Sequence, residues 1–238
     1  RKEVLSGKAK FGIFGDGKEL PQIAMAKVFD KGDFRSGYYR DQTFMFAINK
    51  LTVKQFFSGL YANTSFEEEP MSGGRQMGSH FSSIFVDSKG DFVDLTKQYN
   101  ISSDISPTSG QMPRLLGLAM ASKHFRSGKF NSNKLSNNGN EIAWGTIGNA
   151  STSEGLFFET VNAIGVHQVP AVISIWDDDY GISVDNSYQT TKSSISEALK
   201  GFQRTKTEKG FEILTVNGWD YPSLISTYEH ANNVARNE

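Results

Sequence analysis

Apolar runs alternate with amphipathic segments along the second half of the chain, and this pattern predicts alternating strands and helices. Residues 141–147 and 169–176 are short apolar runs, so we expect a buried strand at each. A helix is expected between them, ending near Gly165, and a third strand over residues 211–216 precedes a helix that begins near Tyr221. Such alternation favours parallel β-α-β units. We therefore predict an α/β fold with a parallel sheet and helices on both of its faces.

The first half contains Gly-rich turns and three expected helices, over residues 20–29, 53–62 and 111–125. In the last of these, Pro113 suits a first helical turn. Residues 130–140 are rich in Asn and Ser and are predicted to form a solvated loop between the two halves. No internal repeat is visible.

Composition limits the class of protein. The 238 residues are 37% hydrophobic and include 18 Phe, which is enough apolar surface for one large domain or two small ones. The 25 Lys and Arg nearly balance the 26 Asp and Glu, leaving a net charge of −1. This balance provides no basic surface for nucleic acid or an anionic membrane, so we exclude both as main partners. Because Cys is absent, thiol nucleophiles and disulfides are excluded, and any metal must bind through oxygen atoms or His.

The ends of the chain also bear on its class. No apolar run approaches the roughly 18 residues that a membrane span requires, and no signal-peptide core follows the N-terminus. We therefore expect a cytoplasmic protein. The chain begins at Arg1 rather than Met and ends in a polar run, so we also expect a fragment, truncated at both ends, of a longer protein.

The loop after the first expected strand is small and polar. Residues 148–151 (GNAS) open onto a helix N-terminus, where free N–H groups and the helix dipole favour a phosphate. Ser151 and Glu154 have the spacing of a capping box, in which each side chain bonds an orphan backbone N–H. Simple turn chemistry is the alternative interpretation of this loop.

The loop after the second expected strand contains three consecutive carboxylates, Asp177 to Asp179. They would repel one another unless a positive charge lies among them, and Mg²⁺ accepts carboxylate, amide and carbonyl oxygens together with phosphate oxygens. Open parallel sheets bind ligands at the carboxyl ends of their strands. Asn149, one of Asp177 or Asp178, and the carbonyl of Tyr180 are therefore candidates to hold one ion that carries a diphosphate. An acidic solvated turn is the alternative.

These two loops together resemble the thiamine-diphosphate motif of the first components of 2-oxo acid dehydrogenases, in their alpha-subunit type. The matching residues are 148–155 (GNASTSEG), Asn162 and 176–183 (WDDDYGIS). Three further segments resemble the family's motifs in the family's order, namely 37–41 (GYYRD), 73–80 (GGRQMGSH) and 106–113 (SPTSGQMP). The resemblance extends from about residue 12 to 230. It implies a thiamine-diphosphate-binding fold, with residues 1–238 as a single alpha-type domain that binds the diphosphate and the metal.

The sequence departs from the family's pattern at two positions that compensate. Asn149 stands where the family has an acidic residue, and Asp178 stands where the family has the second of two Asn residues. One carboxylate and one amide are therefore retained, although the exchange is expected to change how the metal is bound. Ala150 replaces a Gly of the family motif.

The resemblance implies roles for individual residues. Tyr39 and Arg40 would bind the diphosphate, although Arg40 paired with Asp41 at the surface is the alternative. His80 would be catalytic and line the substrate channel, whereas His124, His167 and His230 are expected late in helices or at helix ends, where imidazoles commonly cap carbonyls. The remaining cofactor-binding candidates are Ser106, Thr108 through its carbonyl, Gly148, Asn149, Ala150, Ser151 and Trp176. The implied metal ligands are Asn149, Asp178 and Tyr180, and Asp177 would orient the ligand next to it. Ser106 and Gln111 would shape the loop that carries Thr108.

The function that the resemblance implies is oxidative decarboxylation of a 2-oxo acid, dependent on thiamine diphosphate and Mg²⁺. The acyl group would pass to the lipoyl group of an acyltransferase partner. A beta-type subunit or domain would supply the thiamine-activating Glu, so activity is expected only with that partner. The Gly-Arg-Gln-Met run resembles the branched-chain type of enzyme.

Two other functions stay open on the sequence. One is a non-catalytic cofactor-binding or assembly module that kept the fold, since two metal positions differ from the family. The other is a generic nucleotide-binding domain, which no Gly-x-Gly-x-x-Gly fingerprint supports.

Overall fold

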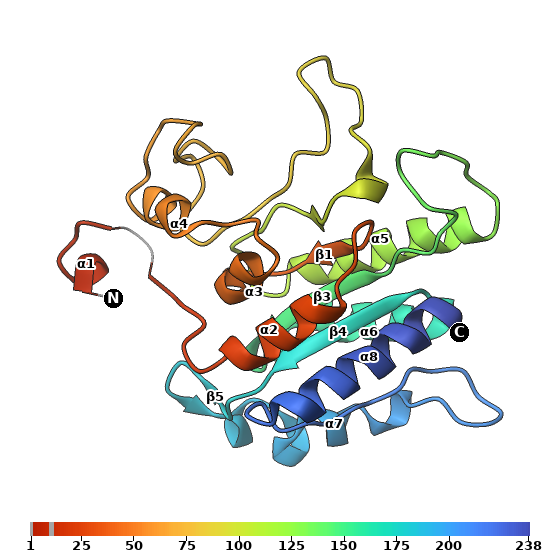
Figure 1. The fold of residues 1–238 in the computed structure, drawn as a ribbon. Helices are drawn as coiled ribbons and strands as arrows, with labels where there is room; N and C mark the ends of the chain where they lie inside the picture. Colours follow the sequence, from red (N-terminus) through yellow and green to blue (C-terminus); the bar gives the residue numbers. More distant parts are fainter. Residues whose placement is uncertain (1, 10–11) are drawn as a thin grey trace.

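A four-stranded parallel sheet lies at the centre of the computed structural model, which describes residues 2–9 and 12–238 (Figure 1). Its strands are β1 (Phe34–Ser36), β2 (Asn100–Ile101), β3 (Ala143–Gly148) and β4 (Ala171–Trp176). They are arranged in the order β2-β1-β3-β4, and all neighbours run parallel. The predicted α/β fold with a parallel sheet is therefore confirmed.

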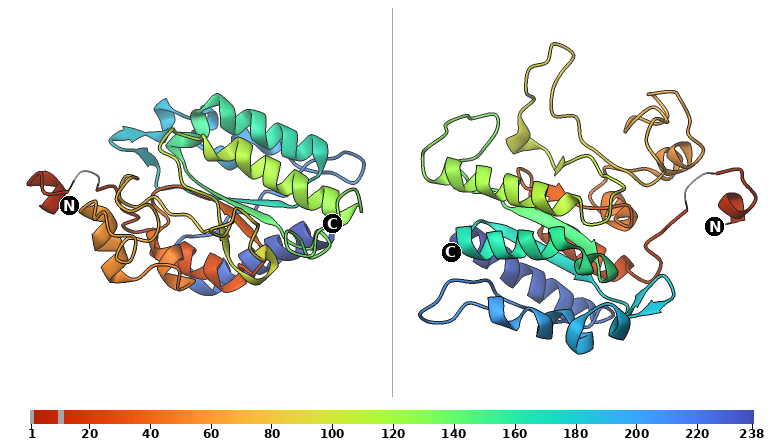
Figure 2. Two further views of the ribbon diagram at one scale, coloured as in Figure 1. Left: turned by 90° about the horizontal axis from the view of Figure 1, so that it is seen from above. Right: turned by 180° about the vertical axis from the view of Figure 1, so that it is seen from behind.

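Helices cover both faces of the sheet. Figure 1 looks onto α2 (Glu19–Val28), α3 (Gln42–Ala47) and α8 (Tyr221–Asn237), and the right-hand view of Figure 2 looks onto α5 (Gln111–Arg126) and α6 (Gly155–His167). Side chains of successive strand residues point to opposite faces, so β3 contributes to two cores. Trp144 packs with the α2 and α8 side, whereas Ala143 and Ile147 pack with the α5 and α6 side.

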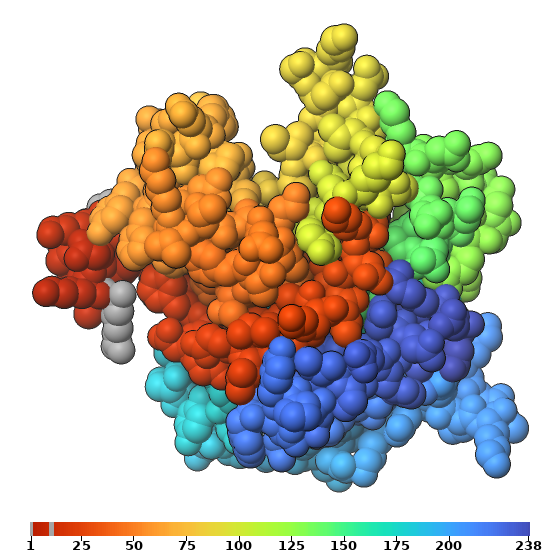
Figure 3. Space-filling model, viewed as in Figure 1, coloured from red at the N-terminus to blue at the C-terminus, as the bar shows by residue number. Residues whose placement is uncertain are grey.

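Short elements complete the chain. They are α1 (Lys2–Leu5), α4 (Val53–Leu60), η1 (Leu95–Lys97), η2 (Ala150–Ser153), β5 (Tyr180–Gly181), β6 (Val184–Asp185), η3 (Asn186–Tyr188), η4 (Thr191–Ser193), α7 (Ile195–Ala198) and η5 (Lys200–Phe202). β5 and β6 form an antiparallel pair beyond the end of β4. The segment after α4 and the segment before β2 stand out from the body of the molecule, with a hollow between them (Figure 3).

The three helices expected in the first half match α2, α4 and α5 within two residues at each end, and residues 130–140 form no helix or strand. The prediction that His230 lies at a helix end is wrong, because His230 lies within α8, where its Nε2 is 2.7 Å from Glu212 Oε2. No helix in the described part of the chain combines the length and hydropathy that crossing a lipid bilayer demands.

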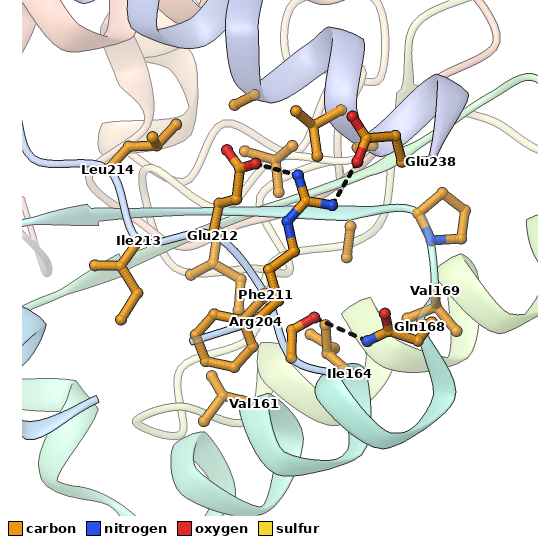
Figure 4. Close-up of a pocket in the computed structure, with 18 of the residues that line it drawn as sticks. Val161, Ile164, Gln168, Val169, Arg204, Phe211, Glu212, Ile213, Leu214 and Glu238 are labelled. Atoms are coloured by element: carbon orange, nitrogen blue, oxygen red, sulfur yellow. Dashed lines mark hydrogen bonds and ion pairs between the residues drawn. The ribbon is translucent and has the colours of Figure 1, made fainter. Parts of the chain in front are cut away.

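The predicted strand over residues 211–216 is also wrong. In the described part of the chain, the only β-type backbone pairing of this segment is an isolated bridge between Phe211 and Gln203. Side chains of this segment and of β4 line a cavity of about 480 Å³ instead (Figure 4). A strand requires a paired edge, and in the described part of the chain no backbone pairing joins residues 211–216 to β4.

Candidate cofactor site

The loops after β3 and β4 meet at the carboxyl edge of the sheet. The two strands pair in register up to Gly148 and Trp176, so the residues that follow are neighbours. Asn149 Nδ2 donates a hydrogen bond to the carbonyl of Tyr180 at 3.0 Å. A Cβ atom at Gly181 would lie 2.6 Å from the Ala150 side chain, so the two loops are in close contact.

Asn149 also belongs to a buried chain of amides. Its Nδ2 donates to Asn186 Oδ1 at 2.9 Å, and Asn186 Nδ2 donates to Asp177 Oδ1 at 3.0 Å. Both Asn residues are 3% exposed. Asp177 is therefore linked to Asn149 through Asn186. Asn186 follows β6 and carries no motif by which the sequence would single it out.

Asp178 takes a different partner. Its side chain is 51% exposed, and its Oδ2 lies 2.5 Å from Nζ of Lys18, which precedes α2. In this arrangement Asn149 and Asp178 therefore take different partners. Asn149 presents its amide nitrogen, not its oxygen, to the Tyr180 carbonyl, and Asp178 is held by an ammonium group.

The donor atoms nevertheless fit a hard cation by their chemistry, since they comprise a carboxylate, an amide oxygen and a carbonyl oxygen. Among residues 2–9 and 12–238, no group of three His, Asp or Glu side chains is placed to hold a metal ion. The expected ligand set contains only one such side chain.

The predicted capping box at Ser151 and Glu154 is wrong. Residues 150–153 form the short helix η2, and α6 begins only at Gly155 with Glu154 as a cap that makes no side-chain hydrogen bond. Ser151 lies inside η2, so it is not at an N-cap. Its carbonyl accepts a hydrogen bond from the hydroxyl of Ser109 instead.

The Tyr-Arg segment after β1 packs against the same edge. The Tyr38 ring centroid lies 5.8 Å from that of Trp176 and 5.2 Å from that of Tyr39. The Arg40 guanidinium carbon lies 5.7 Å from the Tyr38 ring centroid and 5.2 Å from that of Tyr39. A Cβ at Gly148 would lie 3.3 Å from the Tyr38 hydroxyl and 3.9 Å from Arg40 Nη1, so both groups lie close to the backbone of this loop.

The alternative in which Arg40 pairs with Asp41 is wrong. Asp41 is fully buried and pairs with Arg35 of β1, and the described part of the chain contains no ion pair at Arg40. The Arg40 guanidinium is therefore available to an anion at the carboxyl edge of the sheet. Burial and the Asp41 carboxylate raise the pKa of Tyr38 above its ordinary value, so the phenol stays neutral.

His80 lies against this group of residues. It is 5% exposed, and its ring centroid is 6.2 Å from that of Tyr39. Nδ1 lies 3.2 Å from the carbonyl of Gly78 and Nε2 lies 3.0 Å from Ser106 Oγ. A carbonyl only accepts, so Nδ1 donates, and Nε2 of the neutral ring then accepts from the Ser106 hydroxyl.

The segment before α5 is anchored to the sheet, although Thr108 itself is exposed. Gln111 Nε2 donates to the carbonyl of Thr146 at 3.0 Å, and the carbonyl of Gln111 accepts from Ser36 Oγ at 2.8 Å. The structure thus gathers Tyr39, Arg40, His80, Ser106, Gly148, Asn149, Ala150, Ser151, Trp176 and Tyr180 at one edge of the sheet. None of these residues lines the cavity of Figure 4.

The chain matches both a known protein family and curated relatives. A family model described as Dehydrogenase E1 component matches residues 3–238. The 2-oxoisovalerate dehydrogenase subunit alpha of Bacillus subtilis (strain 168) is 28% identical over 232 residues, which are 97% of this chain and 59% of that protein. The chain therefore spans about three fifths of the length of this curated relative.

Proposed function

The chain belongs to the dehydrogenase E1 component family, and on that premise we propose that it binds thiamine diphosphate as the alpha-type part of a 2-oxo acid dehydrogenase first component. The observation that carries the proposal is the meeting of Arg40, Gly148 and the Asn149–Tyr180 contact at the carboxyl edge of the sheet. Arg40 pairs with no carboxylate among the residues that the structure describes, and a guanidinium beside a small polar loop suits a diphosphate.

In this proposal residues 1–238 act as one domain in which Tyr39, Arg40 and residues 148–151 hold the diphosphate. Mg²⁺ is held by Asn149, Asp178 and the Tyr180 carbonyl, and it neutralises diphosphate charge. To bind it, Asn149 must turn its amide oxygen toward the ion, and Asp178 must exchange Lys18 for the metal. Ser106, Thr108 and Trp176 border the cofactor.

Thiamine diphosphate, when bound, supplies the electron sink for decarboxylation of the 2-oxo acid. His80 is proposed to contact the substrate, because its ring lies beside that of Tyr39 and its Nε2 is held by Ser106.

The complete reaction is proposed to need other polypeptides or domains. A beta-type subunit or domain would supply the Glu that activates the thiamine, and the acyl group would pass to a lipoyl-bearing acyltransferase. Branched-chain 2-oxo acids are the proposed substrates, supported by the name of the Bacillus relative and the Gly-Arg-Gln-Met run.

The ion pair between Lys18 and Asp178 favours a second candidate, a module of the same fold that binds the cofactor weakly or assembles with partners without catalysis. In that case the Lys18 ammonium would permanently take the place of the metal.

Calorimetric titration of thiamine diphosphate, with and without Mg²⁺, tests the proposal. Asp178→Asn should abolish Mg²⁺-dependent binding, and adding Asn149→Asp should restore it. Asp179→Asn is the matched control, because it removes the same charge one residue away and should leave the affinity unchanged. Equal binding by wild type and Asp178→Asn would remove Asp178 from the metal site. Absence of binding by the wild type under all conditions would refute the cofactor assignment.

A further inference from the structure

Three charged side chains lie buried directly below the Tyr39-Arg40 segment. Arg35 comes from β1, Asp41 precedes α3, and Asp104 follows β2, and each is at most 1% exposed. Arg35 Nε donates to Asp41 Oδ2 at 2.6 Å, and Arg35 Nη2 lies 3.1 Å from Asp104 Oδ1. Thr146 Oγ1 of β3 also donates to Asp41 Oδ2, at 2.5 Å.

Stability alone is a weak reason for this arrangement. Removing charges from water is costly, and well-packed apolar replacements of buried ion clusters are often no less stable. Here two carboxylates share one guanidinium, and neither Arg35 Nη1 nor Asp41 Oδ1 has a hydrogen-bond partner in the described part of the chain. The backbone follows the cluster so closely that a Cβ at Gly37 would collide with both Arg35 and Asp41.

The cluster holds the backbone that leads into the diphosphate-binding segment. Arg35 Nη2 donates to the carbonyl of Tyr38 at 3.2 Å, and the N–H of Tyr38 donates to Asp41 Oδ2 at 3.4 Å. Both backbone polar groups of Tyr38 are thus bound by the ion pair, and Tyr39 and Arg40 fill the two positions between Tyr38 and Asp41.

The same cluster reaches the residue next to His80. The N–H of Phe81 donates to Asp104 Oδ2 at 3.0 Å. One buried group of charges therefore supports the chain on both sides of the candidate site, at the Tyr38–Arg40 turn and at His80.

We propose that Arg35, Asp41 and Asp104 are positioning residues, whose shared ion pairs fix the Tyr39-Arg40 segment in the geometry that receives the cofactor's diphosphate. The proposal rests on the proposed function of the site. These three residues do not touch the diphosphate, and they act through the backbone that they bind.

The test compares two buried carboxylates that differ in their place in the fold. Asp41→Asn removes a charge below the site. Asp33→Asn removes a charge at the opposite end of β1, where Asp33 pairs with Arg236 at 2.6 Å and accepts a hydrogen bond from Trp144 Nε1 at 3.1 Å. The full chain is titrated calorimetrically with thiamine diphosphate and Mg²⁺, and the thermal unfolding midpoint of each variant is recorded.

We expect Asp41→Asn to weaken thiamine diphosphate binding by about tenfold or more. Asp33→Asn should leave the affinity within about twofold, whatever it does to the unfolding midpoint. If the folded Asp41→Asn variant binds as tightly as wild type, or if both variants lose affinity equally, the positioning role is overturned. Wild type that fails to bind refutes the proposed function instead, so the two failures are distinguishable.

Thr146→Val is the second variant, for the case in which Asp41→Asn does not fold. It removes only the hydroxyl that donates to Asp41 and nearly conserves volume. A loss of affinity of about threefold, larger than that of Asp33→Asn, supports the proposal, and unchanged affinity overturns it.

Discussion

The buried Asp41 carboxylate makes the stability of this protein depend on pH in an unusual direction. Burial raises the pKa of Asp41 from 3.8 to about 6, although the adjacent Arg35 acts in the opposite direction. The native state therefore keeps this proton to a higher pH than the unfolded state does. The contribution of Asp41 to stability is full below pH 3.8 and is lost as the pH rises through about 6.

The size of this effect follows from linkage between proton binding and folding. A rise in pKa from 3.8 to about 6 corresponds to about 3 kcal/mol in the free energy of unfolding. Urea unfolding of wild type and Asp41→Asn at several pH values between 4 and 7.5 measures it. Asparagine does not titrate, so the difference in unfolding free energy between the two proteins should change by up to about 3 kcal/mol across this range, in favour of wild type at low pH.

Carboxylates outside the Arg35, Asp41 and Asp104 cluster do not obscure the comparison. Hydrogen bonds lower the pKa of Glu69 and of Glu212, so their contributions to the free energy of unfolding are lost as the pH falls. Both groups are present in wild type and in Asp41→Asn, so these contributions cancel in the difference. Parallel stability curves for wild type and Asp41→Asn would refute the argument that the Asp41 carboxylate is raised by burial.

Two further outcomes are expected. Lys18→Met should tighten Mg²⁺ binding in the presence of thiamine diphosphate by about threefold to tenfold, because no ammonium group then competes for Asp178. Titration with Mg²⁺ measures this affinity. An unchanged affinity would show that Lys18 does not occupy the metal's place. Gly37→Ala should lower the free energy of unfolding by about 1–3 kcal/mol, because the added methyl group collides with Arg35 and Asp41. Gly155→Ala, where the methyl group enters open space, should change this free energy by less than about 1 kcal/mol. Equal urea midpoints for the two variants would contradict the close packing around Gly37.

The layers of this fold follow from local pattern. The run that became β3 is buried throughout, whereas β4 is fully buried only at Ser174 and Trp176 and half-buried elsewhere. The helices between and before these strands begin and end within a few residues of the predicted bounds. The motif residues around Arg40, His80 and Gly148 were recognisable because each motif is contiguous. Parallel strands place their carboxyl ends at one edge, so convergence of the loops was also predictable.

What the sequence by itself determined is thus the set of elements and the loops that carry polar side chains. Tertiary structure alone decided which side chains meet. Lys18 and Asp178 are 160 residues apart, and Arg35 and Asp104 are 69 apart, so no local spacing signals their contact. Among the described residues, the segment at 211–216 has strand-forming residues but no paired edge, and Ser151 has the residue type of a cap but lies inside the short helix η2. Pairing and burial are properties of the assembled core, and they override local preference wherever the two conflict.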